Sequence, residues 1–190
     1  NNWTHRTICS NFGGVGFYHS PNLTSDVLSV GKDGRHILFT IQSTIKDPDT
    51  PDPPIIKILL VYVPATRAER KKWLHVNQDL FKTQDCDIIC GDFNYVEDVI
   101  FDRQPTPSRT PEKHFNFAQY HQMTDIAHEH MFEENIDPST FHTFFSSRWT
   151  SRIDRIYAKA SSKAKYINLL DRPDAKAAHT PILLCLTSKL

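Results

Sequence analysis

The sequence has little that marks it for one class of partner. Its 22 lysines and arginines balance 22 aspartates and glutamates, so the formal net charge is zero. A strongly basic domain would indicate nucleic acid, whereas a neutral one neither indicates nor excludes it, because charge can gather on one face. The four cysteines, at positions 9, 86, 90 and 185, include no CxxC pair. This absence argues against a zinc site, and we interpret all four as reduced thiols of an intracellular protein.

Long hydrophobic runs and targeting signals are also missing. The longest apolar run, residues 55–63, is interrupted by Lys57 and is too short to span a bilayer, so we expect no membrane association. The chain begins with Asn1 rather than Met, and no secretion signal is visible in it. We therefore interpret its start as a truncation or an internal boundary.

The chain is long enough for one domain with a hydrophobic core, and residues 1–190 are expected to form a single domain. Residues 55–63 predict the strongest strand, buried on both faces, and proline-rich residues 46–54 should link it to an antiparallel neighbour at 36–42. Helical periodicity indicates helices at 65–82 and 111–130. Further strands are expected at 13–18, 27–30, 87–90, 140–145, 152–158, 166–170 and 181–187. This order predicts an α+β fold of two packed sheets flanked by helices.

Asp92 and Asn94 directly follow the buried strand at 87–90, in the segment GDFN. A carboxylate and a carboxamide two residues apart at a strand end can face one pocket, where Asp92 would orient or deprotonate a water and Asn94 would hold a phosphate oxygen. Taken alone, an ordinary Asp/Asn turn that closes a strand is the stronger interpretation.

Three further side chains are candidates for the same chemistry. Asp154 lies within an apolar strand in SRIDRIY and needs a partner, which could equally be a nearby arginine. His179 precedes the last strand and could serve as a base or phosphate donor oriented by Asp154, although one of ten histidines is more often incidental. Tyr62 ends the strongest strand, and its hydroxyl could reach a phosphate, but a core tyrosine is the default interpretation.

The order and spacing of these segments resemble the exonuclease-endonuclease-phosphatase superfamily, which has the DNase I-like fold. The resemblance is closest to LINE-type retrotransposon endonucleases and apurinic/apyrimidinic endonucleases, and it extends over nearly the whole chain. Five stretches carry it, namely GGVG at 13–16, VYVP at 61–64, GDFN at 91–94, HTFFS at 142–146 followed by SRIDRIY at 151–157, and AHTPI at 178–182.

The resemblance implies roles for individual residues. Asp92 would position the attacking water, with Asn94 beside it on the phosphate; His179 would contact the scissile phosphate, Asp154 would orient His179, and Tyr62 would contact the phosphate. For nucleic-acid binding, Thr143 would sit at a DNA-facing strand edge. The loop 146–150, with Arg148 and Trp149, would enter a DNA groove, and Arg152 would add charge beside it.

The chain also departs from the family pattern. The family begins with strands that supply a polar metal-proximal residue and a metal-binding glutamate, and this chain starts after both and after the first helix. Where the family has a metal-binding Asp before the catalytic His, this chain has Ala178, and Ala65 stands where Asn is often found after the Tyr-x-Pro turn. Because Mg²⁺ is held by only one or two carboxylates, we expect no metal site in this chain, although the family requires Mg²⁺ or Mn²⁺.

These features predict a Mg²⁺-dependent endonuclease-type domain for DNA that is inactive or strongly impaired as this chain. The alternative is a pseudoenzyme that binds nucleic acid or a protein partner, for which Arg148, Arg152, Arg155 and residues 67–72 supply charge, unless they form only a solvated face. A phosphatase or deadenylase relative is a third option. The missing strands should expose a sheet edge that a second copy of the chain or a protein partner covers. A nuclear location would follow from a chromosomal DNA substrate.

Overall fold

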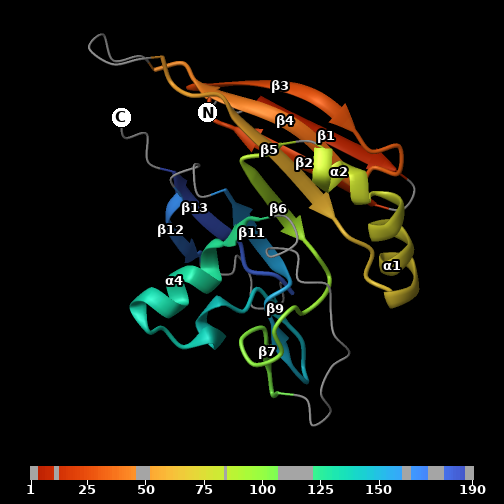
Figure 1. Ribbon diagram of the computed structural model, residues 1–190, viewed down its shortest axis with the longest axis vertical. Coiled ribbons are helices and arrows are strands. Elements are labelled where there is room, and N and C mark those ends of the chain that lie inside the picture. The colour runs from red at the N-terminus through yellow and green to blue at the C-terminus, as the bar shows by residue number, and fades with distance from the viewer. Residues whose placement is uncertain are drawn as a thin grey trace.

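A six-stranded mixed sheet forms the centre of the protein. A computed structural model describes residues 4–10, 13–45, 52–83, 85–106, 122–159, 164–170 and 178–186. The central sheet has the strand order β3-β4-β5-β6-β11-β8, in which only β5 and β6 are parallel (Figure 1). Its strands are β3 (Leu23–Val30), β4 (His36–Ser43), β5 (Ile56–Tyr62), β6 (Ile88–Asp92), β8 (Thr124–Asp125) and β11 (Asp154–Ala158).

Smaller elements cover the two faces of this sheet. Two hairpins, β1–β2 and β12–β13, pair only within themselves in the described part of the chain, and a three-stranded sheet has the order β7-β10-β9. The remaining elements are β1 (Thr4–Ser10), β2 (Gly13–His19), α1 (Arg67–Val76), α2 (Gln78–Thr83), β7 (Arg103–Gln104), α4 (Ile126–Glu134), the 3-10 helix η1 (Pro138–Phe141), β9 (Phe144–Phe145), β10 (Thr150–Ser151), β12 (Ala164–Leu169) and β13 (Ile182–Leu186).

The core consists of two hydrophobic clusters, one on each face of the central sheet. Along β5, Leu59 and Val61 face the cluster that contains Trp73 of α1, whereas Ile58 faces the cluster that contains Val15 of β2. Successive side chains of a strand point to opposite faces, so β5 contributes to both clusters. Burial on both faces is confirmed for residues 58–63, whereas Ile55 at the start of the expected run is 62% exposed. The antiparallel pairing of β4 with β5 is confirmed as well.

The structure differs from the sequence-based expectation in several segments. The expected helix 65–82 is divided into α1 and α2, and β1 and β7 were not expected. The described part of the expected helix 111–130 is a turn and then β8, and α4 begins only at Ile126, because the Asp125 side chain accepts a hydrogen bond from the main-chain N–H of His128 and caps the helix there. Residues 111–121 lie outside the described residues. The strand expected at 140–145 is shortened to β9, because Pro138 and the capping side chain of Asp137 start η1 before it.

Gly91 allows β6 to pass close to β5 just before Asp92. Its φ angle is +141°, and a Cβ atom placed on it would lie 1.9 Å from the main-chain oxygen of Val61. No side chain larger than hydrogen fits this contact, so the close approach of the two parallel strands requires glycine at this position. The position of the Asp92 backbone depends on that approach.

Two arginines that the sequence assigned to nucleic acid are instead buried in an ion-pair network. Arg152 and Arg155 are 2% and 1% exposed. Arg152 pairs with Asp102 at 2.6 Å and with Asp125 at 2.7 Å, and Arg155 pairs with Asp102 at 3.1 Å. The expectation that these guanidinium groups face DNA is therefore wrong, because buried carboxylates on the loop before β7 and at the start of α4 bind them.

This network fixes the loop before β7 against β10 and β11. Burial alone would raise the pKa of Asp102, but the positive charges of Arg155 and Arg152 lower it to about 2. The carboxylate also accepts hydrogen bonds from the main-chain N–H groups of Glu97 and Asp98.

Among the thiols whose side chains are described, Cys86 and Cys90 are not joined in a disulfide. No helix among the described residues combines the length and apolar character needed to cross a bilayer.

We predict that Arg152→Ala lowers the free energy of unfolding by about 3–5 kcal/mol, because it leaves buried carboxylates without a partner. Arg148→Ala is the matched control: it removes the same charge from an exposed position and should change stability by no more than about 0.5 kcal/mol. Urea unfolding of both variants measures the difference. Equal, small losses would mean that the network contributes nothing specific to the fold.

Candidate active site

Asp92 and Asp154 are brought together by the pairing of β6 with β11. The two residues are direct partners in the antiparallel register. Opposite residues of such a pair project from the same face with their Cβ atoms only about 5 Å apart. Both side chains line a cavity of about 550 Å³. The fold therefore places two carboxylates next to each other in an open cavity, as the sequence predicted for a single site.

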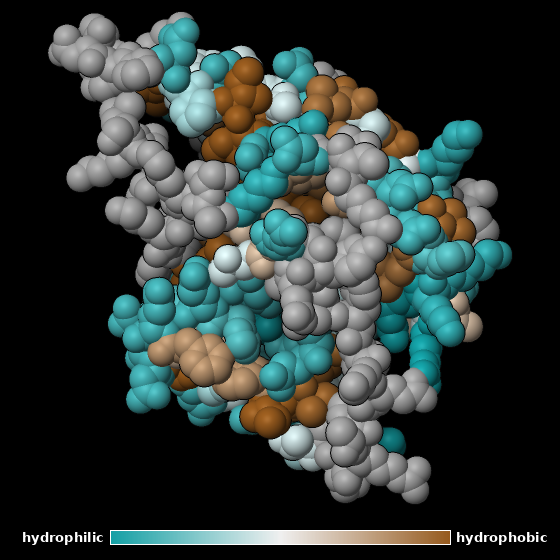
Figure 2. Space-filling view, in the orientation of Figure 1, coloured by the Kyte–Doolittle hydropathy of each residue, from teal (hydrophilic) through white to brown (hydrophobic). Residues whose placement is uncertain are grey.

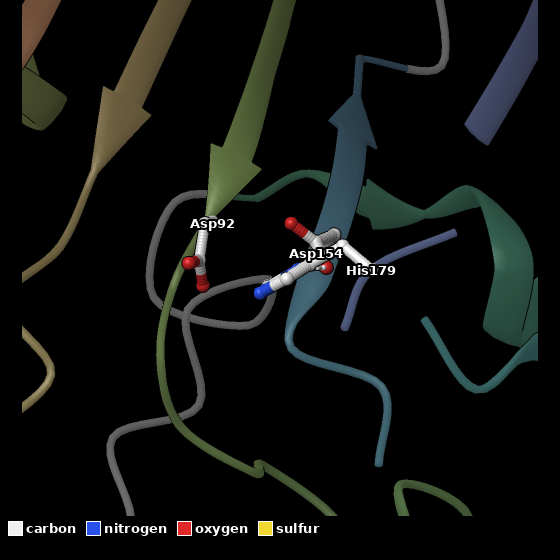
Figure 3. Close-up of side chains that lie close together, drawn as sticks. All are labelled: Asp92, Asp154 and His179. Carbon is white, nitrogen blue, oxygen red and sulfur yellow. Dashed lines mark hydrogen bonds and ion pairs between the residues drawn. The ribbon is translucent and has the colours of Figure 1, made fainter. Parts of the chain in front are cut away.

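His179 completes this group from a third segment of the chain. Its Nδ1 lies 2.8 Å from Oδ2 of Asp154, and Figure 3 shows the Asp92, Asp154 and His179 side chains pointing toward one another. The backbone around His179 is fixed by β9 and its neighbour, since Phe145 N–H donates to the Ala178 oxygen and Thr180 N–H donates to the Thr143 oxygen. Asp154 therefore has a histidine as its partner rather than an arginine.

Asn94 holds the Asp92 carboxylate in place. Its main-chain N–H donates to Oδ1 of Asp92 at 2.8 Å, and its side-chain amide donates to Oδ2 at 3.0 Å and to the Val63 oxygen at 2.9 Å. Asn94 adopts a left-handed conformation with φ +53°, and its main-chain oxygen accepts from Arg70 at 2.6 Å. Because both amide hydrogens are used within the chain, the expected contact with a phosphate would require one of these bonds to break.

The local environment raises the pKa values of two of these groups, which suits them to acid–base chemistry. Burial, and then the neighbouring charge of Asp154, raises the pKa of Asp92 to about 6. The hydrogen bond that His179 donates to Asp154 raises the pKa of His179 above its ordinary value of 6.5. A carboxylate with a raised pKa is a stronger base toward water, and a protonated imidazole can donate to a phosphate oxygen.

The same three side chains could hold a cation. Their potential ligand atoms all lie within 4.8 Å of one another, and within the described ranges they are the only such group of three. The sequence-based expectation of no metal ligands missed this group, because it considered only the family's usual metal positions. Two carboxylates and one imidazole suit Mn²⁺ better than Mg²⁺, which prefers oxygen ligands alone.

Tyr62 lies beside Asp92, whereas Thr143 takes a different position from the one expected. Tyr62 is the partner of Asp92 in the parallel register, its ring packs against the core, and its contact with a phosphate stays a prediction. Thr143 is completely buried, and its hydroxyl accepts hydrogen bonds from the N–H groups of Ile153 and Asp154 at 3.2 and 3.0 Å. The expectation that Thr143 faces DNA is wrong; it positions the backbone of Asp154 instead.

The loop 146–150 is a tight turn between β9 and β10. The hydroxyl of Ser146 accepts from the N–H groups of Arg148 and Trp149 and donates to the Trp149 oxygen. Arg148 is exposed, and Trp149 is 39% exposed. The turn presents a cation and an aromatic ring beside the site, and their contact with DNA stays a prediction.

Three residues that the sequence analysis did not single out contribute near this site: Asp102, Arg103 and Phe144. Asp102 follows an apolar segment, as Asp154 does, and an acid in such a context is a signal of a buried partner. Phe144 packs its ring edge-on against His179, with ring centroids 5.2 Å apart. Arg103 lies over the ring of Trp149, and no local pattern in the sequence points to that contact.

Comparisons with known proteins agree on one family and fold. The sequence model described as "Endonuclease/Exonuclease/phosphatase family" matches residues 3–175. The structure is similar to the endonuclease domain of TRAS1, a telomere-specific non-LTR retrotransposon, with a TM-score of 0.58 and 11% identity over 97% of this chain and 79% of that chain. No curated protein matches the chain significantly by sequence.

Two bacterial structures are similar as well. An endonuclease/exonuclease/phosphatase family protein from Bacteroides thetaiotaomicron has a TM-score of 0.51 and 15% identity over 99% of this chain and 76% of that chain. A functionally unknown conserved protein from Enterococcus faecalis has a TM-score of 0.52 and 13% identity over 98% of this chain and 77% of that chain. At these identities the likeness shows the fold alone, which is the DNase I-like α+β fold expected from the sequence.

The raised pKa of Asp92 predicts a pH-dependent cost in stability. Between its ordinary value of 3.8 and about 6, the folded chain binds more protons than the unfolded chain, so stability falls as pH rises through this window. Asp92→Asn removes the charge and keeps only one of the two oxygens that accept from Asn94, so it also loses one hydrogen bond. We predict that its melting temperature relative to the parent rises as the pH increases from 4 to 7.5, measured in EDTA. A difference that does not vary with pH would contradict this assignment.

Proposed function

Because the chain belongs to the endonuclease/exonuclease/phosphatase family, we propose that it is a divalent-metal-dependent phosphodiesterase domain of endonuclease type that acts on DNA, inactive or strongly impaired as this chain. The observation that carries this proposal is the convergence of Asp92, Asp154 and His179 in one open cavity. The likeness to a retrotransposon endonuclease domain supports DNA as the substrate, as does the exposed cation and aromatic ring on the turn 146–150.

The three side chains divide the chemistry of hydrolysis between them. Asp92, held by Asn94, orients a water and accepts its proton as the water attacks phosphorus. His179, held by Asp154, donates a hydrogen bond to a non-bridging phosphate oxygen. When bound, a divalent cation supplies positive charge that neutralises the charge developing on the phosphate and on the leaving oxygen.

The residue before His179 is the reason we propose impaired activity. Ala178 is exposed, and its carbonyl is bound by β9, so the position is well defined but offers no ligand. Asp92 already accepts two hydrogen bonds from Asn94, and Asp154 binds His179, which leaves few free oxygen atoms for Mg²⁺. We propose that the carboxylates of Asp92 and Asp154 hold a cation only weakly, while His179 stays bound to Asp154 as the phosphate donor.

Ala178 also favours the second candidate, a pseudoenzyme that retains the binding surface without the chemistry. Its target would be nucleic acid or a protein. The outer strand β3 offers a surface for a second copy of the chain or a protein partner, since Val27, Leu28 and Val30 are exposed along it and Figure 2 shows hydrophobic atoms over this edge.

If the substrate is chromosomal DNA, the domain acts in the nucleus.

Nicking of supercoiled plasmid tests the proposal. With Mn²⁺ or Mg²⁺, the parent chain should nick slowly or not at all, and Ala178→Asp should nick faster by on the order of tenfold or more, because it adds a carboxylate ligand. Ala178→Asn is the matched control, equal in size but uncharged, and should not gain activity. Adding His179→Ala to Ala178→Asp should abolish the gain.

Other results of the nicking assay distinguish the impaired endonuclease from the pseudoenzyme. Rapid nicking by the parent that His179→Ala abolishes would show that the site is not impaired. No nicking by Ala178→Asp, with salt-sensitive DNA binding retained, would support the pseudoenzyme instead. No nicking and no DNA binding by any variant would exclude DNA as the substrate.

A further inference from the structure

A second cavity, of about 320 Å³, lies beside the candidate active site. Two of its lining residues touch the first site directly. The Asn94 amide binds Asp92 at 3.0 Å, and the Phe144 ring packs against His179 with centroids 5.2 Å apart. A nucleic-acid strand with one phosphate at Asp92 and His179 would therefore place a neighbouring nucleotide at this cavity.

Arg103 and Trp149 form a stacked pair at the wall of this cavity. Arg103 belongs to β7, which pairs with β10 in a register that sets Arg103 opposite Ser151, two residues after Trp149. The guanidinium carbon of Arg103 lies 5.1 Å from the centre of the Trp149 ring. Since Trp149 is 39% exposed, part of its ring is accessible to another flat group.

Arg103 has a hydrogen-bond donor that the protein does not use. Its Nε is buried, and nowhere in the described part of the chain does it find an acceptor. None of the described residues that line the cavity is acidic. Nη1 of Arg70, the other described cation there, donates to the main-chain oxygens of Pro64, Ala65 and Asn94. Because Nε of Arg103 is buried, a ligand in the cavity meets the terminal nitrogens of its guanidinium.

We propose that Arg103 is a specificity-determining residue that contacts a base of the nucleotide next to the cleaved bond. This inference rests on the proposed action on DNA. The stacked guanidinium donates through its terminal nitrogens to acceptor atoms on the edge of the base, while the accessible part of Trp149 supports its face. Guanine presents two acceptors side by side, thymine presents one, and an abasic position presents none.

The test is DNA binding measured by fluorescence anisotropy, in EDTA so that no cleavage occurs. The probes are short fluorescein-labelled duplexes that differ at one position, which carries guanine, thymine or no base. The variants are Arg103→Met, Arg103→Lys, which keeps the charge but lacks the planar fork, and the matched control Arg148→Met, which removes an exposed cation from the neighbouring turn. Circular dichroism confirms that each variant is folded.

We expect the parent to prefer guanine over the abasic position by roughly fivefold or more. Arg103→Lys and Arg103→Met should both lose this preference, and Arg103→Lys should keep the salt dependence of the parent. Arg148→Met should keep the preference and reduce the salt slope by about one.

A base preference that survives in Arg103→Lys would overturn the inference, as would Arg103 variants that behave like Arg148→Met. If the parent binds no duplex, the proposed action on DNA fails together with this inference; if it binds and the Arg103 variants match it, this inference alone fails.

Discussion

The site depends on the antiparallel pairing of β6 with β11, because that register sets Asp92 directly opposite Asp154. Two adjacent carboxylates repel each other, and their repulsion together with burial raises the pKa of Asp92 to about 6. The chain offsets part of this cost with the hydrogen bonds of Asn94 to Asp92 and of His179 to Asp154. This arrangement also sets a carboxylate of raised pKa beside the imidazole of His179 in an open cavity.

Two buried arginines beside Asp154 stabilise that arrangement. Arg152 and Arg155 join the loop before β7 to the β10–β11 region through Asp102, and Thr143 binds the backbone of Asp154. Arg152, Arg155 and Thr143, whose chemistry alone suggests DNA binding, therefore position the strand that carries Asp154. The groups left facing outward beside the site are the exposed Arg148 and the Arg103–Trp149 pair, which lies over the second cavity.

Local patterns predicted much of this molecule, and long-range pairing accounts for what they missed. Apolar runs gave β4, β5 and β6, and the segments GDFN, SRIDRIY and AHTPI indicated Asp92, Asp154 and His179, which the fold brings together. Strand alternation could not show that Arg152 is buried, because its partners Asp102 and Asp125 lie 50 and 27 residues away. The start of α4 was misplaced for a different, local reason, since the capping contact of Asp125 with the N–H of His128 sets where the helix begins.

The central claim is that Asp92, Asp154 and His179 form a metal-dependent phosphodiesterase site that lacks a ligand at position 178. Titration of Mn²⁺ followed by electron paramagnetic resonance tests it most directly, with the parent, Ala178→Asp, and Ala178→Asp combined with Asp92→Asn. The account predicts a Kd above about 1 mM for the parent, at least about tenfold tighter binding with Ala178→Asp, and loss of this gain without the Asp92 charge. Equal and tight binding by the parent and Ala178→Asp, or a gain that persists in the Asp92→Asn background, would contradict it.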